Sequence, residues 1–148
     1  MMNLLFIASA VLFNLLIAGI FIADSRSNMR WVRMLDIGVV LLIILFLVVF
    51  LDFIKRPIAD LAKIGFGLVL LYLLVEFVLD FIFKFDFRSK WSTHIPYILL
   101  EYAAFFGLIY MASTISKNAM WLVSITFWIA MGCLVFLYAG KRSKRARE

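Results

Sequence analysis

Five long apolar segments divide the chain, and short polar segments separate them. A helix that crosses the hydrocarbon layer of a bilayer needs about 20 mostly apolar residues. The segments have that length, and they lack the alternation at every second residue that marks a membrane β-strand. Backbone groups in lipid must be satisfied within the span, so each segment is predicted to be helical. We therefore expect an all-α, polytopic integral membrane protein with five transmembrane helices, over residues 2–23, 34–54, 64–83, 95–115 and 118–140.

The composition supports the bilayer as the solvent for most of the chain. Hydrophobic residues make up 66 % of the 148 residues, whereas soluble domains contain about 45–50 %. A chain this short cannot bury such an excess inside one water-soluble core. No connection between the spans is long enough to fold as a soluble domain. The sequence therefore predicts a single membrane domain over residues 1–148, and it excludes a soluble enzyme or a soluble binding module.

The basic residues are distributed unevenly between the two sides of the predicted bundle. Eleven Lys and Arg residues lie in 24–33, 84–94 and 141–148, and only four lie in the other two connections. The positive-inside rule predicts that the larger group is cytoplasmic, with the N-terminus outside and the C-terminal tail inside. The net charge of +6 then favours anionic lipid headgroups, and not nucleic acid, as the partner. The candidates for headgroup contact in the tail are Lys141, Arg142, Lys144, Arg145 and Arg147.

Three acidic residues lie within the predicted third and fourth spans. An acidic side chain near the middle of a bilayer costs roughly 2.5–3.5 kcal/mol, so a partner must offset that cost or a function must use the charge. Glu76 and Asp80 share one helix face because they are four residues apart. Glu101 lies at an intermediate depth on the next, antiparallel span, and Tyr72 extends the face of Glu76 by one turn. We expect the three carboxylates to converge, facing protein, and to share protons or hold a cation.

A structural interpretation of these acids stays open beside the functional one. Asp80 can pair with Lys84 at the membrane interface, and Glu101 can reach basic residues of the same connection or the headgroups. For the two aspartates that flank the second span, structural pairing is the better interpretation. Those pairs are Asp36 with Arg33, and Asp52 with Lys55 and Arg56.

Small and polar residues form stripes along three of the predicted spans. In lipid, small residues let helices approach closely, and interhelical hydrogen bonds add to that packing. The candidates are Asn14 in the first span, Ala103 and Gly107 in the fourth, and Thr126, Ala130 and Cys133 in the fifth. We do not expect five helices to use all three stripes internally, so at least one stripe should face another chain.

No catalytic constellation is visible in the sequence. The chain lacks the G-x-G-x-x-G, P-loop, H-E-x-x-H and G-x-S-x-G motifs. It has one cysteine, Cys133, and one histidine, His94, so one chain cannot form a disulfide or a Cys/His zinc site. We expect no cofactor, no metal and no enzymatic activity. The sequence favours an accessory or assembly subunit of a membrane complex, bound to a partner protein or to further copies of itself. The alternative is a small oligomeric transporter or channel that conducts protons or cations through its intramembrane carboxylates.

Overall fold

The described residues of the protein are almost entirely helical. The computed structural model describes residues 1–83 and 91–145, with the side chains at 80–81, 91–94 and 138–145 outside the description. Its helices are α1 (Met2–Ser25), α2 (Met29–Ile54), α3 (Asp60–Phe77), α4 (Trp91–Ile115) and α5 (Lys117–Arg145), and the π-helical turn η1 (Val78–Phe83) continues α3. No strand occurs in the described ranges. The all-α class predicted from the sequence is confirmed.

Four helices are long and apolar enough to cross a membrane, and they coincide with four of the five predicted spans. They are Met2–Ser25, Met29–Ile54, Ile95–Ile115 and Lys117–Leu137. The predicted third span is not among them, because the 18 residues of α3 include three charged side chains, those of Asp60, Lys63 and Glu76. An integral membrane helical bundle is therefore supported by length and composition, and the crossing by α3 stays a prediction.

Four of the helices begin earlier than the predicted spans do, and α1 begins where predicted. The second helix starts at Met29, five residues before the predicted start, because the Asn28 side chain accepts a hydrogen bond from the Trp31 amide and caps it. Just before this cap, Ser27 adopts a left-handed φ of 56°, which closes a tight turn after α1. This turn makes α1 and α2 antiparallel neighbours.

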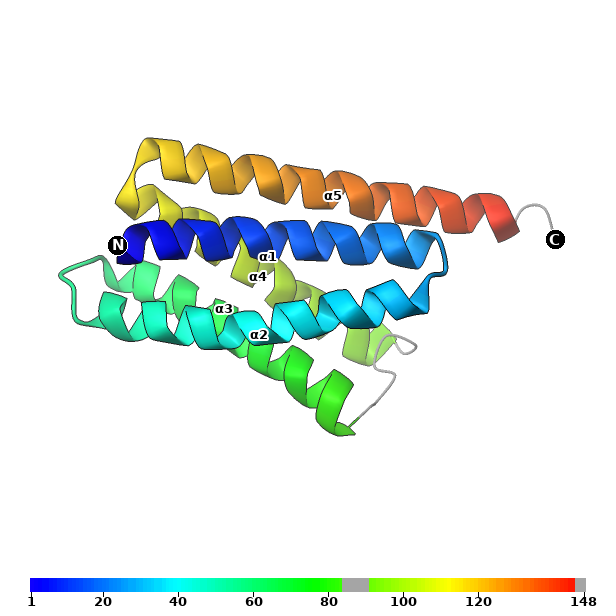
Figure 1. Ribbon diagram of the computed structural model, residues 1–148, viewed down its shortest axis with the longest axis horizontal. Coiled ribbons are helices and arrows are strands. Elements are labelled where there is room, and N and C mark those ends of the chain that lie inside the picture. Colours follow the sequence, from blue (N-terminus) through cyan, green and yellow to red (C-terminus); the bar gives the residue numbers. More distant parts are fainter. Residues whose placement is uncertain (84–90, 146–148) are drawn as a thin grey trace.

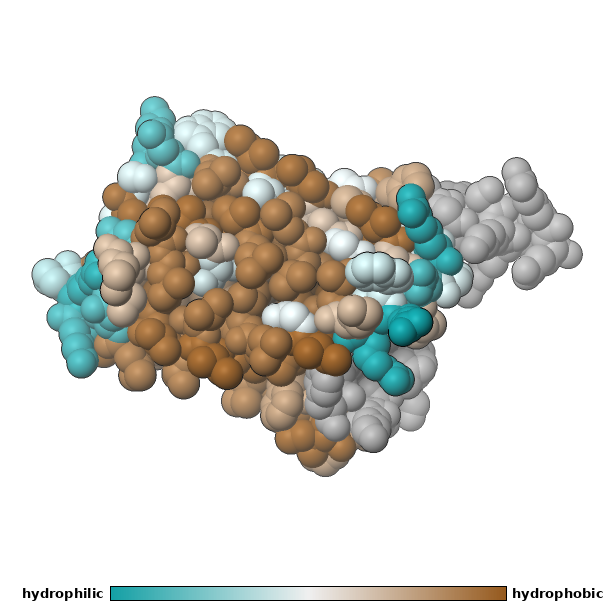
Figure 2. Space-filling view, in the orientation of Figure 1, coloured by the Kyte–Doolittle hydropathy of each residue, from teal (hydrophilic) through white to brown (hydrophobic). Residues whose placement is uncertain are grey.

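The five helices contact one another in a closed ring, in the order α1, α2, α3, α4, α5 and back to α1. Figure 1 shows that the N-terminus lies at the same end of the bundle as the α2–α3 and α4–α5 connections. The α1–α2 turn and the C-terminal end of α5 lie at the opposite end, which is called the turn end below. On the face drawn in Figure 2, apolar surface covers the middle of the bundle and hydrophilic residues gather toward both ends, as a bilayer requires.

Aromatic rings close the half of the bundle that contains the N-terminus. Phe6, Phe53 and Phe66 are buried there, and Phe6 and Phe66 meet edge to face at a centroid distance of 5.4 Å. Phe13 and Phe46 continue the cluster toward mid-bundle with a second edge-to-face contact at 6.2 Å. Such pairs contribute about 0.5–1.5 kcal/mol each beyond their buried area. This aromatic core fills the interior at one end, and the turn end is built differently.

Candidate functional site

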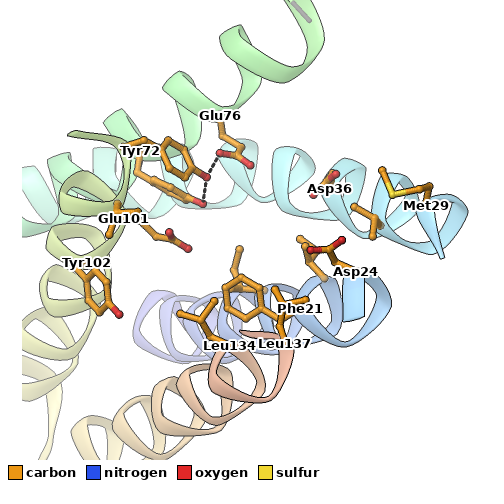
Figure 3. A pocket seen from close by; sticks show the side chains of 15 residues that line it. Phe21, Asp24, Met29, Asp36, Tyr72, Glu76, Glu101, Tyr102, Leu134 and Leu137 are labelled. Carbon is orange, nitrogen blue, oxygen red and sulfur yellow. Dashed lines mark hydrogen bonds between the residues drawn. The ribbon is translucent and has the colours of Figure 1, made fainter. Parts of the chain in front are cut away.

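A cavity of about 550 Å³ lies inside the turn end of the bundle. All five helices contribute to its wall, which contains Asp24 from α1, Asp36 from α2, Glu76 from α3, Glu101 from α4 and Leu134 from α5. Figure 3 shows the four carboxylates distributed around the cavity, with Asp24 and Asp36 toward the α1–α2 turn. Among the described residues of the wall, every charged side chain is acidic.

A chain of hydrogen bonds joins α3 to α4 at the wall of this cavity. The Tyr97 hydroxyl donates to the Glu76 carboxylate, and the hydroxyls of Tyr72 and Tyr97 lie 3.0 Å apart (Figure 3). Glu76 is only 5 % exposed, so its carboxylate is held inside the protein and not among lipid chains. A buried carboxylate requires hydrogen-bond donors of this kind, because an unsatisfied one is very costly.

The local sequence explains why both helices present a tyrosine and a glutamate together. The pattern Tyr-x-Leu-x-Glu occurs as Y-L-L-V-E at 72–76 on α3 and again as Y-I-L-L-E at 97–101 on α4. Residues four apart lie on one face of a helix, so each copy places its tyrosine and its glutamate on the same face. Because α3 and α4 run antiparallel, Tyr97 of one copy reaches Glu76 of the other. This repeated pattern is readable in the sequence, although only Tyr72 of its two tyrosines was among the predicted residues.

Two of the three carboxylates predicted to converge line one cavity. Glu76 and Glu101 line the same cavity, as expected for carboxylates that face protein. Asp80 lies in η1, and its side chain is outside the described residues. Asp24 and Asp36 complete the set, although Asp36 was expected to be an interfacial partner of Arg33 and Asp24 was not singled out. The pairing predicted for Asp52 is confirmed, with Arg56 Nη2 at 2.5 Å from its carboxylate.

The carboxylates are spread around the wall and not gathered at one point. Among the described residues, no three His, Cys, Asp or Glu side chains lie close enough together to hold a metal ion.

The small-residue stripes all lie on contacts between helices of this one chain. The Asn14 amide on α1 donates to the Thr126 hydroxyl at 2.8 Å and to the Val123 carbonyl at 3.1 Å, both on α5. Farther along α5, Ala130 is buried and Cys133 is partly buried. On α4, Gly107 packs directly on the backbone of Gly65 of α3, and Ala103 is partly buried one turn away.

The expectation that at least one stripe faces another chain stays a prediction. Ring closure gives every helix two neighbours in the same chain, and the stripes pack within that ring, while Ala103 and Cys133 keep part of their surface exposed. The stripes alone therefore do not require a partner protein. A partner or an oligomer stays a proposal that other observations must support.

The headgroup contacts expected of the basic tail stay a prediction. The side chains of Lys141, Arg142, Lys144 and Arg145 lie outside the described residues, as does Arg147 altogether. Contact of these residues with anionic headgroups and the orientation of the chain across the membrane are not tested by the fold.

Comparison with protein-family models, with curated proteins and with solved structures finds no match to this chain. The function is therefore inferred from the chain's own geometry. The central feature is a cavity with acidic and aromatic walls, and Phe13 of the aromatic core packs against the wall residue Tyr72.

Proposed function

We propose that this protein carries protons or other cations across the membrane, with Glu76 and Glu101 as the binding groups. The observation that supports this most is the burial of Glu76 at the wall of the cavity, in hydrogen-bond contact with Tyr97. An ionisable residue inside a membrane bundle is expensive and indicates a functional site, of which ion and proton pathways are common kinds. Glu101 faces the same space from the neighbouring helix, so a cation in the cavity meets carboxylates from both α3 and α4.

The arrangement favours a carrier over an open channel. The cavity occupies the turn end, whereas the interior beyond it is filled by the aromatic core from Phe13 to Phe66. A ligand in the cavity therefore has access from one end only in this conformation. Translocation then requires the aromatic core to loosen while the turn end closes, which is the alternating access of membrane carriers.

The positive-inside rule gives this carrier a direction. It places the turn end, with the cavity, on the cytoplasmic side, and the aromatic core on the outer side. The conformation described here is then the one that binds and releases cations on the cytoplasmic side. The function proposed is non-enzymatic, and it is compatible with an assembly of several copies.

Flux measurements on the reconstituted full-length protein test this proposal. A pH-sensitive dye inside the vesicles reports proton movement under an imposed membrane potential. We expect flux from the unaltered protein that Glu76→Gln and Glu101→Gln each abolish. Asp60→Asn is the matched control, because Asp60 is an exposed acid at the start of α3, paired with Lys63 and remote from the cavity wall.

A failure of the flux test would favour the accessory or assembly subunit that the sequence predicts. Vesicles without flux, or flux that survives both glutamine substitutions, would overturn the carrier. If the protein purified from native membranes then holds a second protein in stoichiometric amount, an accessory or assembly subunit becomes the better account.

A further inference from the structure

We infer that the cavity binds an organic cation with an apolar or aromatic body, an inference that rests on the proposed function and names its substrate class. The volume is the first observation. At about 550 Å³ the cavity falls within the range of about 300–1,000 Å³ that small-molecule sites occupy, and it far exceeds the space that a proton or a bare metal ion needs.

The walls supply the second observation, because they are mainly apolar and aromatic. Phe21, Tyr72, Tyr97 and Tyr102 line the cavity from α1, α3 and α4, and aliphatic side chains fill the gaps between them. Rings of this kind attract a positive charge through their electron-rich faces, and the attraction grows as water is excluded. An aromatic wall contributes little to the binding of an inorganic cation that keeps its water shell.

The chemistry of the carboxylates fits the same ligand. Four of them face the cavity from four different helices, and no three gather into a metal site in the described part of the chain. Ca²⁺ takes six to eight oxygen ligands and Mg²⁺ demands near-ideal octahedral geometry, which a dispersed set does not provide. A bulky cation distributes its charge over a larger surface, so it can meet separated carboxylates at once.

The repeated Tyr-x-Leu-x-Glu pattern gives the binding arrangement. It places one ring and one carboxylate on α3, and one ring and one carboxylate on α4, with the two rings in contact at a centroid distance of 5.7 Å and both carboxylates at the cavity wall (Figure 3). Tyr102 adds a ring deeper along the α4 side. A cation there contacts both helices, so its binding is coupled to the α3–α4 contact that holds the bundle closed.

Equilibrium binding of tetraphenylphosphonium to the purified full-length protein in detergent tests the inference. Tetraphenylborate, which has the same shape and the opposite charge, is the matched ligand control. We expect saturable binding of the cation and none of the anion. Glu76→Gln and Glu101→Gln should each weaken cation binding about tenfold or more, because each removes a charge from the wall. Thermal unfolding of each variant confirms that it still folds.

A second pair of variants separates the aromatic contribution from general damage to the fold. Tyr102→Leu should weaken binding of tetraphenylphosphonium about two- to fivefold, since it removes one ring from the wall. Tyr110→Leu on the same helix is the control, because Tyr110 is 39 % exposed and lies outside the cavity. That substitution and Asp60→Asn should leave binding unchanged.

The results distinguish failure of this inference from failure of the proposed function. Equal binding of the anion, or cation binding that none of the cavity substitutions weakens, would overturn the organic-cation site. Proton flux that depends on Glu76 and Glu101 without any binding of tetraphenylphosphonium would also overturn it, while the carrier itself would stand. Binding of tetraphenylphosphonium that the cavity substitutions weaken, without proton flux, would overturn the carrier and leave the organic-cation site standing. Absence of both binding and flux would overturn both.

Discussion

Alanine at position 107 would place a methyl group inside the contact between α3 and α4. Gly107 lies on the backbone of Gly65, and a Cβ built on it would overlap the Gly65 carbonyl oxygen and fall 2.8 Å from the carbonyl carbon. Ordinary van der Waals contact begins near 3.4 Å, so the helices must separate by at least about 0.6 Å at this point. The obstacle is backbone, which cannot rotate away as a side chain would.

The expected loss of stability follows from two opposing effects. Overpacking of a close contact costs about 1–3 kcal/mol, and the rigid neighbour here argues for the upper half of that range. The change from glycine to alanine returns about 1 kcal/mol through helix propensity. We therefore expect Gly107→Ala to lower the free energy of unfolding by about 1–2 kcal/mol.

Two further glycines of α3 complete a graded series. A Cβ on Gly65 would meet the Gly107 Cα at 3.0 Å, so Gly65→Ala should be the milder change. A Cβ on Gly67 would meet nothing within 4 Å, so Gly67→Ala should be neutral or stabilising. Unfolding in mixed micelles, followed by circular dichroism, measures all three variants. If Gly107→Ala is as stable as Gly67→Ala, the close approach of α3 and α4 described here does not exist.

Three other outcomes are expected. A double-mutant cycle on Asn14→Ala and Thr126→Ala should give a coupling of about 0.6 kcal/mol in unfolding measurements, as interhelical hydrogen bonds in membranes do; a coupling of zero would contradict the α1–α5 hydrogen bond. Glu76→Gln should retain the unfolding midpoint of the unaltered protein, because the amide oxygen still accepts a hydrogen bond, whereas Glu76→Lys should lower it markedly; equal midpoints would show that position 76 is not buried. In a cysteine-free background, Ser27→Cys should react with a membrane-impermeant thiol reagent only from the cytoplasmic side and Ser116→Cys only from outside; the reverse pattern would invert the orientation.

The class of the protein was predictable because lipid imposes it on the sequence. Long apolar segments with no alternation allow only helices, and the described structure is helical. Helix ends were predicted less well. Apolar residues mark only the part of a helix that lies in lipid. The helix itself extends beyond them into polar residues, and α2 begins at its N-terminal cap, Asn28.

The site was predictable only where single residues were unusual. Glu76 and Glu101 stood out because acids are costly in lipid. Asp24 and Asp36 did not stand out as site residues, because an aspartate near the end of a predicted span is ordinary. Only the closed ring of helices brings both of them to a common cavity. Tyr97 was missed for a different reason. The contact between α3 and α4 was expected, but which α4 side chain reaches Glu76 depends on how the two helices are rotated, which the sequence does not determine.

The same limit applied to the small-residue stripes. Asn14 and Thr126 were each candidates for packing, and the structure joins them by a hydrogen bond. Gly65 was not a candidate, although it forms the other half of the Gly107 contact. Pairing across helices depends on rotation and depth, which residue spacing along one helix does not determine.

The central claim is that the buried carboxylates of the cavity move cations across the membrane. The most direct test compares proton flux into vesicles that contain equal amounts of the unaltered protein, Glu76→Gln, Glu101→Gln or Asp60→Asn. We predict equal flux from the unaltered protein and Asp60→Asn, and flux no greater than that of empty vesicles from both glutamine variants. Flux from the glutamine variants that equals the flux of the unaltered protein would contradict the claim.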